Sequence, residues 1–119
     1  MQDLNAKERL IVEVLDDGVN FKLINPLLIY VDSNPYIIPA GFITDFASIP
    51  KIFHSFLTPT GRYAKASVLH DYLIYKKQGT RLQIDKKFLQ AMKDTGVSFL
   101  TRYVMYFAVR LYVGISGKR

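Results

Sequence analysis

The residues in this sequence that are best suited to chemistry are an adjacent pair, His70–Asp71, and a later carboxylate, Asp85. A neutral imidazole accepts protons near physiological pH, and a carboxylate bound to one ring nitrogen leaves the other free to act. We therefore interpret His70 as a candidate general base and Asp85 as the group that orients it. The alternative is a buried His–Asp pair that only holds two helices together.

Helical spacing is what brings these two side chains together. Residues 62–76 predict a helix on which His70 shares a mostly small or apolar face. The next predicted helix carries Asp85 within its apolar stripe, where a carboxylate needs a partner because burying it alone is costly. A short loop joins the two helices, so we expect antiparallel packing that places His70 and Asp85 roughly level.

Three further polar residues are candidates for binding a substrate or a metal ion: Asp45, Ser48 and Asp71. Asp45 and Ser48 interrupt an apolar run at the junction between predicted strands and helices, a place that often faces a cleft. The alternative for both is a local role in capping a helix at Pro50. One His with several Asp would suit Ca²⁺, Mg²⁺ or Mn²⁺, or no metal at all, whereas two His without Cys make structural zinc unlikely. No motif for an organic cofactor is present.

A basic and aromatic stripe follows the last predicted helix. Arg102, Tyr106 and Arg110 recur at four-residue spacing and so share one side of it. Such a stripe is usually the solvated face of a half-buried helix. The alternative is a contact surface for a protein partner, a phosphate or a membrane surface.

Strands are predicted throughout the first half of the chain. Asp16–Gly18 is a turn signal between two apolar runs and predicts a hairpin, and Pro and Gly interrupt the last of the runs. The first three expected strands cover residues 9–15, 20–24 and 27–31. Residues 36–39 and 41–43 form either one further strand or a pair of strands.

Three or four helices are predicted in the second half. Ser48 and Pro50 suit the start of a short helix that ends near Leu57. Thr80 and Gln83 form a capping box, which opens a helix. The three longer predicted helices cover residues 62–76, 80–93 and 98–113. Strands followed by helices, without alternation, predict an α+β fold.

Length and composition favour one domain. The 119 residues suffice for one core, with a strand-rich part (7–44), a helical part (48–113) and a short basic tail (114–119). The lack of Cys excludes the disulfide-rich secreted class. The first nine residues mix acids and bases, unlike a signal peptide. The stretch 97–113 carries two arginines and predicts a core helix, not a transmembrane segment.

The formal net charge of +6 favours a solvated basic surface. Binding to nucleic acid is the alternative, and we consider it unlikely because no familiar motif supports it.

An ordered series of motifs resembles a known family. From about residue 39 to 113 the chain resembles the small phage and prophage proteins of domain-of-unknown-function family 1353. The resemblance implies a phage or prophage origin, hence a place in the host cytoplasm or the phage particle, and brings no established activity. The matching segments are Phe42–Pro50, Gly61–Tyr63, Leu69–Leu73, Ile84–Phe88 with Met92, and Met105–Arg110.

A weaker resemblance bears on mechanism. The pair His70–Asp71, with Asp85 on the next helix, is similar to the helix pair of secretory phospholipases and of the phospholipase domain in parvovirus capsids. That resemblance implies that His70 activates a water, Asp71 binds Ca²⁺ and Asp85 orients His70. The sequence departs from those enzymes because it has no disulfides and only one Gly between residues 58 and 63, where they have a Gly-rich calcium loop.

Two functions therefore stay open. The first is a hydrolase, acting on lipid esters or components of the host envelope, with His70 as general base. The second is a non-catalytic virion component or accessory protein that binds a phage or host partner. The sequence leaves the oligomeric state undetermined.

Overall fold

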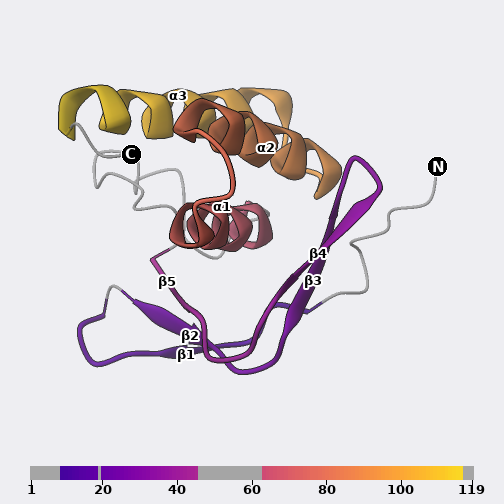
Figure 1. The fold of residues 1–119 in the computed structure, drawn as a ribbon, viewed down its shortest axis with the longest axis vertical. Coiled ribbons are helices and arrows are strands. Elements are labelled where there is room, and N and C mark those ends of the chain that lie inside the picture. Colours follow the sequence, from indigo (N-terminus) through magenta and orange to yellow (C-terminus); the bar gives the residue numbers. More distant parts are fainter. Residues whose placement is uncertain (1–8, 19, 46–62, 117–119) are drawn as a thin grey trace.

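The chain forms strands first and helices afterwards (Figure 1). The computed structural model describes residues 9–18, 20–45 and 63–116, with side chains as far as residue 111. Within these ranges the order of elements confirms the predicted α+β class. The strands are β1 (Val12–Val14), β2 (Phe21–Leu23), β3 (Leu27–Val31), β4 (Asn34–Ile38) and β5 (Ile43–Thr44), and the helices are α1 (Ala64–Lys76), α2 (Arg81–Asp94) and α3 (Phe99–Ser116).

The first sheet has the strand order β1-β2-β5, with both pairings antiparallel. The predicted hairpin between β1 and β2 is confirmed, and Gly18 supplies the positive φ of 69° that its turn requires. In the same turn, the carboxylate of Asp17 accepts a hydrogen bond from the backbone N–H of Asn20 at 2.9 Å. Strand β1 is shorter than predicted, because only Val12–Val14 pair with β2.

The second sheet is the β3–β4 hairpin, which extends beside the helices in Figure 1. Its turn consists of Asp32 and Ser33, both at positive φ (52° and 66°). We predicted that this second strand begins at residue 36, but β4 already begins at Asn34 and includes Pro35. Pro35 is tolerated there because β4 is an edge strand, which can lack a backbone N–H.

The run that we predicted as one strand or a strand pair is divided between the two sheets. Its first part ends β4, and its second part becomes β5, which pairs with β2. Gly41, at φ 90°, turns the chain between them, and its N–H donates to the carbonyl of Leu23 at 2.8 Å. The division places Thr44 at the end of β5, directly before the junction with the helical half.

The three long predicted helices are present with small shifts in their ends, and α3 continues to Ser116. The capping box of α2 is confirmed: Thr80 Oγ1 accepts from the Gln83 N–H, and the Gln83 side chain accepts from the Thr80 N–H. The predicted short helix from Ser48 to Leu57 lies outside the described residues. No helix in the described part of the chain is long and apolar enough to cross a membrane.

One apolar core joins the strands to the helices. α1 lies between the strands and the α2–α3 pair (Figure 1), and it contacts β3, β4, β5 and α2. α3 packs on α2, and its side chains Met105, Ala108 and Val109 are buried. The most deeply buried core side chains come from both halves, and they include Leu23, Leu27, Ile29, Ile38, Leu69, Leu73, Phe88 and Met92.

Candidate functional site

The carboxylate of Asp85 is completely buried and accepts hydrogen bonds from three side chains. Oδ1 lies 2.6 Å from His70 Nε2 and 2.9 Å from Arg81 Nε, and Oδ2 lies 2.8 Å from Arg110 Nη1. We call these four residues the Asp85 cluster. The predicted contact between His70 and Asp85 is therefore present.

The residues of the Asp85 cluster lie on α1, α2 and α3. His70 lies on α1, Arg81 one turn before Asp85 on α2, and Arg110 on α3. The positions are fixed because α2 packs against both α1 and α3. Asp85 thus connects the helices at a point where no solvent reaches its oxygens, and its charge is balanced by guanidinium groups instead of water.

His70 is bound on one side of its ring only. Asp85, as a carboxylate, accepts the Nε2–H, so Nδ1 carries no hydrogen and is an acceptor. Nδ1 is buried and has no hydrogen-bond partner within the described residues. The Phe88 ring lies against the imidazole, with centroids 4.7 Å apart.

The environment lowers the pKa of His70 below its usual 6.5. Burial is the main cause, since it disfavours the charged imidazolium, and the nearby charge of Arg81 acts in the same direction. The hydrogen bond and charge of Asp85, and more weakly the charge of Asp45, act in the opposite direction without reversing the shift. His70 is therefore neutral at physiological pH.

The pKa of Asp85 is also lowered, from its usual 3.8. Burial alone would raise it, but the hydrogen bonds that His70, Arg110 and Arg81 donate together outweigh burial. Asp85 is therefore ionised at neutral pH, and its negative charge meets two guanidinium groups.

Asp71 has a different role from its neighbour His70. Its Oδ2 accepts hydrogen bonds from Thr44 Oγ1 at 2.5 Å and from the backbone N–H of Asp45 at 3.1 Å. Asp71 therefore ties the end of β5 to α1. These contacts place Asp45 close enough to His70 for its charge to act on the imidazole.

The carboxylates that the structure describes are not gathered into a metal-binding group. In residues 9–18, 20–45 and 63–111, no group of three or more His, Cys, Asp or Glu side chains could hold a metal ion. Asp85 is occupied by three donors, and one oxygen of Asp71 is occupied by two. The role of Asp71 as a metal ligand stays a prediction.

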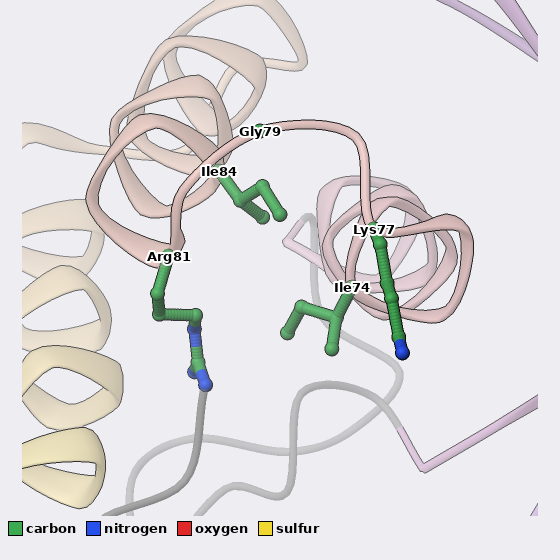
Figure 2. Close-up of a pocket in the computed structure, with 5 residues that line it drawn as sticks. All are labelled: Ile74, Lys77, Gly79, Arg81 and Ile84. Atoms are coloured by element: carbon green, nitrogen blue, oxygen red, sulfur yellow. The ribbon is translucent and has the colours of Figure 1, made fainter.

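A pocket of about 310 Å³ lies beside the Asp85 cluster, at the loop between α1 and α2. Figure 2 shows Ile74 and Ile84 pointing toward each other, with Arg81 on one side and Lys77 on the other. Ile74 lies one turn beyond His70 on α1, and Arg81 belongs to the cluster itself. Gly79 completes the lining, so the pocket combines apolar walls with two cationic side chains.

One residue of the predicted stripe on the last helix, Arg110, belongs to the Asp85 cluster. Arg110, which we assigned to a solvated stripe with Arg102 and Tyr106, instead donates to Asp85 and has only a third of its side chain exposed. Arg102 and Tyr106 are also half-buried. The α3 side chains that are most exposed are instead Phe99, Leu100, Phe107 and Leu111. The role of the stripe as a contact surface stays a prediction. Ser48 lies outside the described residues.

Sequence reasoning did not select two residues that complete the site. Arg81 precedes Asp85 by four residues, a spacing that predicts contact on a helix and could have identified it. Thr44 binds Asp71 across 27 positions of sequence, and no local pattern marks that contact.

Comparison with known proteins gives a family without a described activity. Residues 21–109 match the model of the family described as "Protein of unknown function (DUF1353)". The chain is also 38% identical over 77 residues to "Uncharacterized protein y4jT" of Sinorhizobium fredii (strain NBRC 101917 / NGR234). That match covers 63% of this chain but 23% of the relative, so the chain spans under a quarter of that protein. No solved structure gives a significant match. The match over most of its length establishes that the chain belongs to the DUF1353 family.

Proposed function

We propose that the protein is a hydrolase in which His70 acts as the general base through Nδ1. One observation carries the proposal: Asp85 holds the Nε2–H of a buried, neutral His70, while Nδ1 has no partner in the described part of the chain. An orienting carboxylate on one nitrogen and a lone pair without a donor on the other is the arrangement that base catalysis requires, and a substrate must displace neighbouring side chains to reach this buried atom.

The unpartnered nitrogen is costly unless something uses it. A buried acceptor without a donor costs roughly 1–3 kcal/mol in folding free energy, so native proteins seldom retain one without a reason. Placing an attacking water at Nδ1 supplies the missing hydrogen bond. It also gives a reason for a neutral imidazole at this position in place of an apolar side chain.

The reaction would proceed as follows. The water oxygen attacks a substrate carbonyl carbon while Nδ1 of His70 takes a proton from that water. Asp85 stabilises the resulting imidazolium through Nε2–H. The imidazolium then returns the proton to the leaving alcohol as the carbon–oxygen bond breaks. Ester and water thus become acid and alcohol, and His70 is neutral again.

The pocket beside the Asp85 cluster, which His70 itself does not line, would suit a substrate with an apolar and an anionic part. Ile74 and Ile84 offer apolar contact, and Lys77 and Arg81 offer positive charge. Within the described residues, the hydrogen bond of Arg81 to Asp85 uses Nε, which leaves the Nη groups as donors for an anion. Lipid esters and anionic esters of the cell envelope combine these two features.

Replacement of His70 by Gln tests the proposal. Gln keeps an amide donor for Asp85 but has no basic nitrogen, so we expect hydrolysis to fall by roughly 10²-fold or more with little change in the unfolding midpoint. Purified protein would be assayed on p-nitrophenyl butyrate and on phosphatidylglycerol, with fatty-acid release as readout. Lys76→Gln, an exposed change on the same helix, is the control and should retain activity.

Wild-type protein that hydrolyses none of these esters would count against the hydrolase. Each assay would be run with EDTA and with Ca²⁺. We expect no dependence on Ca²⁺, since no group of the described side chains could hold a metal ion and Asp85 already binds three protein donors. Activity that requires Ca²⁺ would instead favour the phospholipase-like role for Asp71.

A second candidate is a non-catalytic phage protein, either a virion component or an accessory factor. The observation that favours it is that Asp85 binds donors from three helices inside the fold, as a scaffold would. Mass spectrometry of purified particles tests the virion version, which requires the protein at a fixed copy number. Loss of stability without any enzymatic phenotype in His70→Gln would also favour this candidate.

A further inference from the structure

Helix α3 has an apolar face that nothing in the described part of the chain covers. Phe99, Leu100, Phe107 and Leu111 are between 61% and 74% exposed. Met105 and Val109, on the opposite side, are buried against the rest of the fold. An exposed apolar surface of this kind on a small protein usually marks a contact site.

The exposed side chains are continuous along the helix. The Phe99 and Tyr103 rings lie with centroids 4.9 Å apart, and those of Tyr103 and Phe107 lie 6.2 Å apart. With Leu100 and Leu111 they form what we call the α3 face, which follows about three turns of helix.

The charge on α3 has one sign. The helix contains two arginines, Arg102 and Arg110, and no acidic residue, and Arg110 is paired with Asp85. Arg102 lies at the edge of the face, with its guanidinium carbon 5.3 Å from the Phe99 ring centroid and 5.8 Å from that of Tyr103. A ligand that covers the face therefore gains from negative charge around an apolar interior.

We propose that the α3 face binds the surface of an anionic lipid bilayer. Aromatic and aliphatic side chains enter the boundary between headgroups and acyl chains, and arginine at the edge meets lipid phosphates. The helix lies on the bilayer without crossing it, which agrees with its length and hydropathy. A second copy of this chain fits less well, because an α3–α3 contact would bring together helices that carry arginine and no acid. The proposal does not depend on the hydrolase.

Vesicle co-sedimentation of the full chain tests this. Wild type should bind phosphatidylcholine vesicles that contain phosphatidylglycerol, and it should bind them less as salt rises. Phe107→Gln should weaken that binding roughly tenfold. Ile37→Thr is the matched control, because Ile37 is 64% exposed but lies on β4, and it should bind as wild type does. Circular dichroism would verify that both variants fold.

Three outcomes would overturn the proposal. The first is no binding to anionic vesicles at low salt. The second is equal binding by Phe107→Gln and Ile37→Thr, which would separate lipid binding from the α3 face. The third is a dimer in sedimentation velocity that Phe107→Gln dissociates, since this would assign the face to a second copy. His70→Gln should bind vesicles as wild type does. Lipid binding by the α3 face and hydrolysis at His70 can therefore fail independently of each other.

Discussion

At the scale of single residues, burial and the charges around Asp85 together determine the protonation state of His70. A lone carboxylate beside an imidazole would favour the imidazolium. Here Arg81 and Arg110 already neutralise Asp85, and burial penalises a further charge on His70. Burial is therefore the main reason that His70 stays neutral and able to accept a proton at physiological pH, and the charge of Arg81 adds to it.

This lowered pKa predicts how stability depends on pH. An unfolded chain binds a proton at His70 below about pH 6.5, whereas the folded chain resists it, so the free energy of unfolding falls as pH falls through that range. The contribution is at most about 1.4 kcal/mol per pH unit for one group. Urea unfolding of wild type between pH 7.5 and 5 measures it.

His70→Gln should remove this part of the slope, because Gln does not titrate. The difference in unfolding free energy between wild type and variant should therefore shrink or change in favour of the variant as the pH is lowered. A difference that stays constant across the range would show that the folded protein accepts the proton as readily as the unfolded chain does.

At the scale of elements, the loop between α1 and α2 sets His70 level with Asp85. Lys77 ends α1 in the left-handed conformation (φ 54°), and its N–H donates to the carbonyl of Ile74 at 3.1 Å. Gly79 continues the turn at φ 115°, and Thr80 caps α2. Within five residues the chain thus reverses and starts a helix whose first turn carries Arg81.

Thr80→Ala is the prediction at this scale. It removes the hydroxyl that accepts from the Gln83 N–H, so we expect a loss of about 1 kcal/mol in the free energy of unfolding. Thr80→Ser keeps the cap and should lie within a few tenths of a kcal/mol of wild type. Equal losses in both variants, measured by urea unfolding, would show that the methyl group matters and the cap does not.

At the scale of the whole molecule, two features join the strands to the helices. The apolar core contains side chains from both halves, and Asp71 on α1 binds Thr44 and Asp45 at the end of β5. Neither half can therefore lose its structure without exposing apolar surface of the other. This is the physical reason to expect that the described strands and helices behave as one domain.

Unfolding should accordingly be a single cooperative transition. Helix content, followed by far-UV circular dichroism, and tertiary packing, followed by tyrosine fluorescence, should give the same midpoint in urea. The eight tyrosines, in the absence of tryptophan, report from both halves of the chain. Two separated transitions would show that the strand half and the helical half unfold independently.

Local sequence patterns determined much of the architecture. Helix periodicity and the Thr80–Gln83 capping box located α1, α2 and α3, and turn residues located the β1–β2 hairpin. The contact between His70 and Asp85 also followed, because it depends only on helical spacing and a short loop. These features arise from interactions between residues close in sequence, which a local pattern records.

Tertiary structure alone decided the rest. Arg110 reaches Asp85 from 25 residues away, and Asp71 reaches Thr44 from 27, so each depends on how whole elements pack. The rotation of α3 on α2 is decided in the same way: it buries one apolar side and exposes Phe99 and Phe107. A helix that is apolar over much of its circumference does not indicate from its own sequence which side will be covered.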